Sequence, residues 1–122
     1  MAQETEPTWL GKAKMVAAGY KATSRDASGA GHSVYVVLLL DRRRQDPWGL
    51  YVGQTSSDLD WRFDQHKSGY KASGLVRRFG VRLLPDLTEH LNPMRAWESL
   101  ELEEALAEGL TAAGIPWVEG GH

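Results

Sequence analysis

The sequence contains no cysteine, which excludes disulfide bonds and thiolate metal ligands. It also lacks long hydrophobic runs, and the longest, Val34–Leu40, is far shorter than the roughly 20 residues that cross a bilayer. The N-terminus does not have the basic and then apolar layout of a signal peptide. We therefore expect a cytoplasmic protein that does not associate with membranes.

The charge is distributed unevenly along the 122 residues, although the net charge is only −2. Residues 42–82 contain nine arginines and lysines against four acids, a balance of +5. Residues 83–122 contain eight acids and one arginine, a balance of −7. The middle of the chain therefore offers a cationic surface to an anionic partner, which is typical of nucleic-acid binding but not specific to it.

Hydrophobic patterns predict an α+β domain, in which a small antiparallel sheet of three strands, or of four, packs against helices. Ser33–Leu40 and Leu50–Thr55 are rich in strand-forming residues and predict an antiparallel pair. Val81–Leu84 predicts a third strand, and Ile115–Val118 can add a fourth at the edge. Residues 33–120 are expected to form the domain, and residues 1–32 an N-terminal extension that is partly flexible.

Helix boundaries follow from capping residues. A helix is predicted over residues 56–69 after a serine cap, and a short one over Ser73–Phe79. Asn92 is the expected cap of a long helix over Pro93–Gly114, with proline at its first position and glycine at its end. Trp9–Lys21 has the composition of a short helix, which two glycines disfavour.

The long helix carries a carboxylate where one is costly. Its apolar stripe consists of Leu100, Leu106 and Leu110. On a helical wheel Glu103 lies within about 60° of all three, near the centre of the face that must be buried. Such a carboxylate needs a cation, a metal or a hydrogen-bond network, unless its head reaches water at the end of the stripe. The other acids of the helix are expected on the solvent side or the flank: Glu98, Glu101, Glu104 and Glu108.

Two tyrosines and a glycine stand out on the predicted strands. Tyr35 and Tyr51 are ordinary strand residues, but Gly53 weakens a strand unless something approaches its backbone closely. On the next helix Arg62 and His66 are four residues apart and share a face. The residues expected to bind nucleic acid are Gly53, Lys67, Lys71, Arg77 and Arg78. For the four basic residues, the alternative is an ordinary solvent-exposed face.

These motifs resemble the GIY-YIG nuclease superfamily. The resemblance rests on Tyr51-Val52-Gly53-Gln54-Thr55 and on Arg62-x-x-x-His66-x-x-Gly69, followed by a glutamate on a late helix. Ser33-Val34-Tyr35 corresponds to the first motif of the family and Tyr51-Val52-Gly53 to the second. The resemblance covers about Ser33 to Gly120 and implies a GIY-YIG-like fold.

The resemblance also implies a metal-dependent endonuclease that hydrolyses nucleic-acid phosphodiester bonds, DNA more than RNA, with Mg²⁺ or Mn²⁺. Glu103 would be the metal ligand, and Arg62 would bind two phosphate oxygens. The general base remains open among Tyr35, Tyr51 and His66. A tyrosine of pKa about 10 is rarely ionised at pH 7, whereas a histidine of pKa about 6.5 has no such handicap.

Two other functions stay open at this point. The predicted site residues, which we expect to converge on one cleft over the sheet, could bind nucleic acid without cutting it. Alternatively, the basic stretch could contact an acidic protein as part of an interaction domain. A separate recognition domain does not fit in 122 residues, so specificity is expected to be low or to come from a protein partner.

Overall fold

Four strands form one sheet in the order β3-β1-β2-β4 in the computed structural model, which describes residues 5–56 and 74–120. β1 (Ser33–Leu40) pairs antiparallel with β2 (Trp48–Thr55) over its whole length, which confirms the predicted pair. β3 (Gly80–Leu83) lies antiparallel on the other side of β1.

The fourth strand corrects the predicted antiparallel sheet. β4 (Val118–Gly120) pairs parallel with β2, so the sheet is mixed. The long helix α5 (Ala96–Ala112) carries the chain back along the sheet before β4. β4 therefore enters beside the start of β2 and runs in the same direction, as a helical crossover requires. The strand also begins at Val118, the last residue of the predicted segment.

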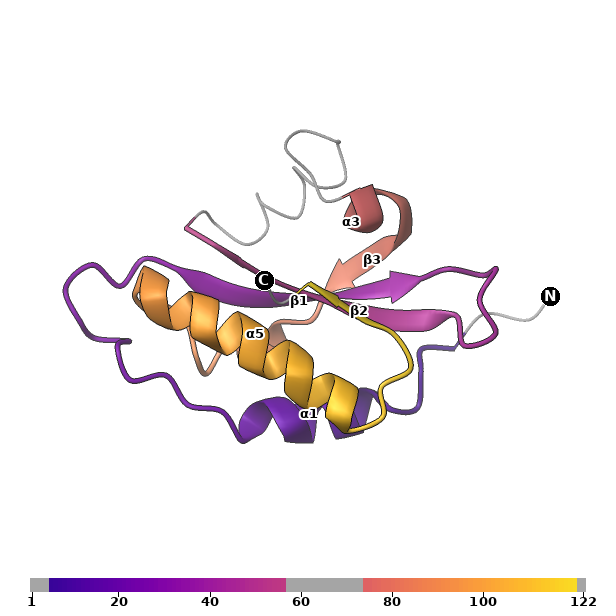
Figure 1. Ribbon diagram of the computed structural model, residues 1–122, viewed down its shortest axis with the longest axis horizontal. Coiled ribbons are helices and arrows are strands. Elements are labelled where there is room, and N and C mark those ends of the chain that lie inside the picture. Colours follow the sequence, from indigo (N-terminus) through magenta and orange to yellow (C-terminus); the bar gives the residue numbers. More distant parts are fainter. Residues whose placement is uncertain (1–4, 57–73, 121–122) are drawn as a thin grey trace.

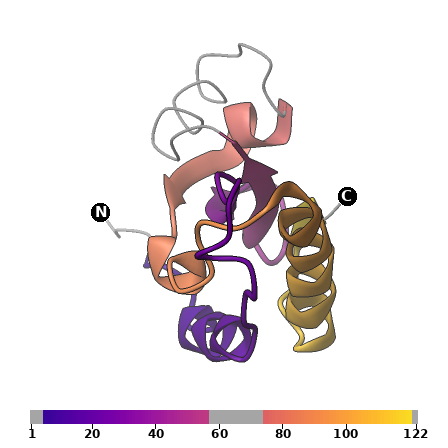
Figure 2. The same cartoon turned by 90° about the vertical axis from the view of Figure 1, so that its left-hand side faces the viewer.

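The helices lie on both faces of this sheet. α1 (Leu10–Ala18), α4 (Pro85–Thr88) and α5 cover one face, and α3 (Gly74–Phe79) covers the other (Figure 1, Figure 2). In the two described ranges no helix combines the length and the apolar character that crossing a bilayer requires.

Side-chain alternation along β1 creates a core on each face. Val34, Val36 and Leu38 pack with α1, α4 and α5, whereas Tyr35 and its same-face neighbours pack with α3 and Trp117. A strand buried on both faces is a nearly continuous hydrophobic run, as observed here.

α5 begins three residues later than predicted. Asn92 does not cap it, because its side chain accepts a hydrogen bond from the Val34 N–H and donates one to the Val34 carbonyl, each at 2.9 Å. Met94 exchanges two backbone hydrogen bonds with His32. These contacts hold the residues before Ala96 in an extended connection. The predicted end is confirmed, since Gly114 follows α5 with φ of 94°.

The predicted division of the α5 residues between a buried and an exposed face is partly wrong. Glu103 is buried as expected, with 4% of its surface exposed. Glu98 was expected in solvent but is 5% exposed, and Leu100 was expected in the core but is 51% exposed. The helical wheel gives only the angle of a side chain, whereas burial also depends on which segment covers each turn.

Candidate active site

Tyr35 and Tyr51 lie together on the face of the sheet that α3 covers. Tyr35 pairs with Gly53 and Tyr51 with Val37, so the tyrosines are diagonal neighbours on adjacent strands. Their ring centroids are 6.3 Å apart and the rings are tilted by 37°. Tyr35 is buried and Tyr51 half-buried. The strand register therefore brings together two residues that are separated by a hairpin in the sequence.

Gly53 provides the space for this arrangement. A Cβ atom at Gly53 would lie 2.5 Å from Cζ of Tyr35 and 2.6 Å from its hydroxyl oxygen. The close approach expected at this glycine is thus made by the Tyr35 ring of the protein itself. Contact between Gly53 and nucleic acid stays a prediction.

Replacement of Gly53 by alanine should displace the Tyr35 ring and lower the free energy of unfolding by about 1–3 kcal/mol, the usual cost of overpacking. The matched control is Gly11→Ala in α1, where nothing lies within 4 Å of the added Cβ. That variant should be unchanged or stabilised by up to about 1 kcal/mol. Urea denaturation measures both. Equal stabilities would show that Gly53 is not needed to seat Tyr35.

Glu103 lies on α5, against the other face of the sheet. One turn earlier, the Ser99 hydroxyl lies 3.3 Å from Oε1 of Gln54 and places the start of α5 beside the end of β2. β4 pairs only with Leu50, Tyr51 and Val52, so the last three residues of β2 extend beyond it. Glu103 is therefore buried one turn of α5 beyond the contact between Ser99 and the end of β2.

Four residues of the predicted site lie outside the described part of the chain, and two more lie on α3. Arg77 and Arg78 are both exposed there, and the Arg78 guanidinium lies 5.0 Å from the centroid of the Phe79 ring. The residues outside the described ranges are Arg62, His66, Lys67 and Lys71.

The described residues offer few protein ligands for a metal. Within residues 5–56 and 74–120, no group of three histidines or carboxylates could hold an ion. A carboxylate does supply the hard oxygen that Mg²⁺ prefers, and Mg²⁺ commonly keeps one or two protein carboxylates with waters and substrate phosphate. Glu103 fits that type of site, in which bound substrate completes the coordination.

Sequence reasoning missed a second buried carboxylate, Glu98. It accepts hydrogen bonds from the backbone N–H and the hydroxyl of Thr23, at 2.7 and 2.8 Å, and from the same two groups of Ser24. The Ser24 hydroxyl also accepts a bond from the Arg95 N–H, the residue before α5. Burial alone would raise the pKa of Glu98, but these hydrogen bonds outweigh it and lower the pKa to about 2. The network is structural and ties the N-terminal segment to α5.

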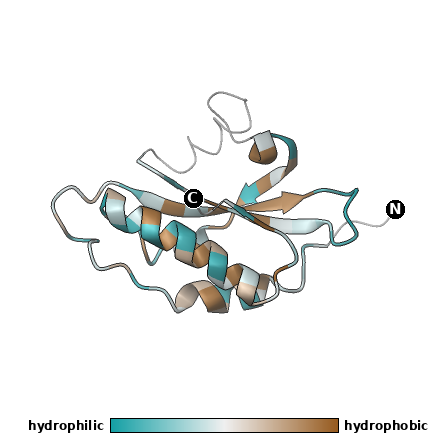
Figure 3. Cartoon of the chain, viewed as in Figure 1, coloured by the Kyte–Doolittle hydropathy of each residue, from teal (hydrophilic) through white to brown (hydrophobic). Residues whose placement is uncertain are grey.

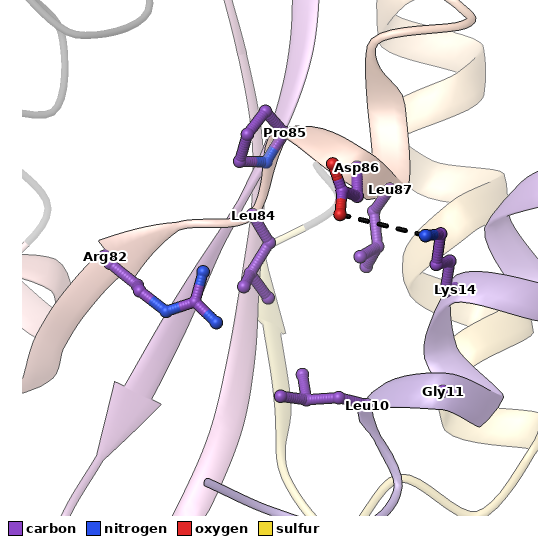
Figure 4. Close-up of a pocket in the computed structure, with 8 residues that line it drawn as sticks. All are labelled: Leu10, Gly11, Lys14, Arg82, Leu84, Pro85, Asp86 and Leu87. Atoms are coloured by element: carbon purple, nitrogen blue, oxygen red, sulfur yellow. Dashed lines mark ion pairs between the residues drawn. The ribbon is translucent and has the colours of Figure 1, made fainter.

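A pocket of about 330 Å³ lies between α1 and α4, and its lining residues do not include Tyr35 or Tyr51 (Figure 4). Lys14 and Asp86 form an ion pair of 3.8 Å at its rim, and Arg82 is held by two bonds of 2.6 and 2.8 Å to Glu6. Its apolar lining belongs to the core on the other face of the sheet: Leu10, Leu84 and Leu87. The pocket is therefore separate from the tyrosine site.

Comparison with known proteins adds no relative. A scan against protein-family models finds no match, and neither curated proteins nor solved structures give a significant one.

Proposed function

We propose that this protein is a divalent-metal-dependent endonuclease of the GIY-YIG type, acting on nucleic-acid phosphodiester bonds and on DNA in preference to RNA. The observation that carries the proposal is the pair of Tyr35 and Tyr51, whose ring centroids are 6.3 Å apart, with the Tyr35 ring seated on Gly53. These residues belong to the two strand motifs on which the family resemblance rests.

Each residue of the proposed site has its own role in hydrolysis. A tyrosine hydroxyl orients the attacking water, and Tyr35, Tyr51 and His66 remain the three candidates for the base that removes its proton. Arg62 offsets the charge that develops on the phosphate. Because a tyrosine of pKa about 10 is a weak base at pH 7, the cation of Arg62 would have to favour its ionised form.

Glu103 would complete the site from the other side of the sheet. We propose that the Glu103 carboxylate approaches the tyrosine site around the end of β2 that extends beyond β4, where Ser99 contacts Gln54. Glu103 would hold Mg²⁺ or Mn²⁺, and the bound ion would act as a Lewis acid on the phosphate.

A plasmid-nicking assay tests the proposal. Supercoiled DNA should be converted to open-circle and linear forms with Mg²⁺ or Mn²⁺ and should stay intact with EDTA. Electrophoresis and a binding titration without metal on the same preparation separate the alternatives. Binding without cleavage would indicate a non-cleaving nucleic-acid-binding module, and the absence of both would favour a protein-interaction domain.

A further inference from the structure

Three arginines cover an aromatic pair at one end of the sheet. The Arg44 guanidinium lies 3.7 Å from the centroid of the Trp117 ring, and the Arg43 guanidinium lies 5.9 Å from that of Phe79. Arg78 approaches the same Phe79 ring at 5.0 Å, and the two rings meet edge to face with centroids 5.8 Å apart. We call these five residues the arginine–aromatic cluster.

The loop between β1 and β2 is built to present two of these arginines. The Asp41 carboxylate accepts the Arg43 backbone N–H at 3.1 Å and the Arg43 Nε at 3.3 Å, and its other oxygen lies 3.8 Å from the Arg44 Nε. The Arg43 N–H and the two arginines keep the pKa of Asp41 below its usual value. No hydrogen bond to a described residue uses the terminal amino groups of Arg43 or Arg44. These groups are therefore available to an external anion.

The cluster shares its face of the sheet with the tyrosines. Trp117 packs against β2 at Gly49, where an added Cβ would lie 2.5 Å from its ring, much as Tyr35 packs on Gly53. Trp117 and Tyr35 belong to one hydrophobic cluster, with Tyr51 and Phe79 packed against it. The two glycines are four positions apart on the strand, which corresponds to about 14 Å. The loop that carries Arg43 and Arg44 is hydrophilic along most of its length (Figure 3).

From this arrangement we infer that the arginine–aromatic cluster is a binding site for the phosphate backbone of duplex DNA, about 14 Å along β2 from the tyrosine pair. The inference rests on the proposed function, because it assigns the substrate-anchoring site of the same enzyme. The cluster contains three guanidinium groups, and Asp41 pairs with those of Arg43 and Arg44. The guanidinium groups of Arg43 and Arg78 lie 5.9 and 5.0 Å from the centroid of the Phe79 ring, so they are no more than about 11 Å apart. Duplex DNA carries a phosphate charge for each 1.7 Å of its axis, so a patch of this size spans several phosphates.

Exposure distinguishes phosphate binding from base stacking. Single-strand binding proteins present aromatic faces on which bases stack. Here Trp117 is 5% exposed and Arg44 lies over its ring, while Arg43 keeps 72% of its side chain in solvent. The surface consequently offers cations rather than ring faces, which suits the sugar-phosphate backbone and gives no base readout.

The test is binding of a fluorescein-labelled 20-base-pair DNA duplex, measured by anisotropy in EDTA between 50 and 300 mM salt. Arg43→Gln combined with Arg44→Gln should reduce the slope of log affinity against log salt by about 2, and the affinity at 0.1 M salt by roughly 60-fold. The matched control removes two exposed charges beside α1 on the opposite face, Lys12→Gln with Lys21→Gln, and should change the slope by much less.

Variants that keep the positive charge, and a cleavage assay of the wild type, provide the remaining controls for the binding experiment. Arg43→Lys with Arg44→Lys should retain most of the salt slope, and thermal unfolding should give similar midpoints for all variants. An unchanged slope in the glutamine variant would overturn the inference, even if the wild-type protein nicks plasmid. The inference would also be overturned if the glutamine variant lost more affinity for single-stranded DNA than for duplex DNA. If the glutamine variant loses duplex binding but the wild type never cleaves with metal, the site stands and the proposed nuclease activity fails.

Discussion

Glu103→Gln should abolish metal-dependent cleavage and leave a folded protein. Glutamine keeps the size of the buried side chain and one acceptor oxygen but removes the charge that would hold the ion. Metal catalysis supplies several kcal/mol, so we expect the nicking rate to fall by roughly a hundredfold to ten-thousandfold. Single-turnover nicking of plasmid with Mg²⁺ measures this effect, and thermal unfolding reports on the fold.

The neighbouring residue provides the control for this experiment. Glu104 is exposed and has the same charge, so Glu104→Gln should keep wild-type cleavage. Two results would contradict the assignment of Glu103. One is a variant that is destabilised by about 3–5 kcal/mol yet still cleaves, as expected if Glu103 only completes a buried ion pair. The other is equal loss of activity in both variants, which would indicate a general effect of charge on α5.

Glu98→Gln should produce the largest loss of stability. The side-chain amide of glutamine would face N–H donors of Thr23 or Ser24, so buried donors would lose their acceptor. We expect the free energy of unfolding at pH 7 to fall by about 2–4 kcal/mol. Glu101→Gln, on the exposed side of the same helix, should change it by less than about 0.5 kcal/mol. Guanidinium denaturation of the two variants measures the difference.

The same carboxylate predicts acid sensitivity of the wild-type protein. Its pKa is about 2 in the folded state and near 4.5 when unfolded, so the folded protein favours the ionised form. This contribution is complete above about pH 4.5 and is lost as the pH falls towards 2. The difference in unfolding free energy between wild type and Glu98→Gln should therefore shrink over this range. A constant difference would mean that the charge of Glu98 is unimportant.

The strands were predictable because their signals are local. β1 is a continuous run of valine and leucine around Tyr35, and the hairpin loop is strongly polar, so the antiparallel pair follows from composition. Once the register is fixed, alternation alone puts Tyr35 and Tyr51 on one face. The direction of β4 was not predictable in this way, because it depends on where α5 returns the chain.

The two buried carboxylates of α5 also show that local sequence patterns do not predict long-range contacts. Burial of Glu103 follows from its own helix, whose apolar residues surround it on the wheel. Burial of Glu98 depends on Thr23, which lies 75 positions away and belongs to a segment of low hydrophobicity. A helical wheel contains no information about which distant segment packs over a side chain. The arginine–aromatic cluster was hidden for the same reason, since Arg44 and Trp117 are far apart in the sequence and meet only in the folded protein.

The mixed sheet also sets an order for assembly during synthesis. β2 leaves the ribosome more than sixty residues before β4, and the outer edge at Leu50, Tyr51 and Val52 has no strand beside it until α5 has been made. An open edge next to a hydrophobic hairpin can pair with another nascent chain. Long-range pairing of this kind also slows folding. The three residues of β4 therefore close the edge at which such pairing would occur, in addition to completing the sheet.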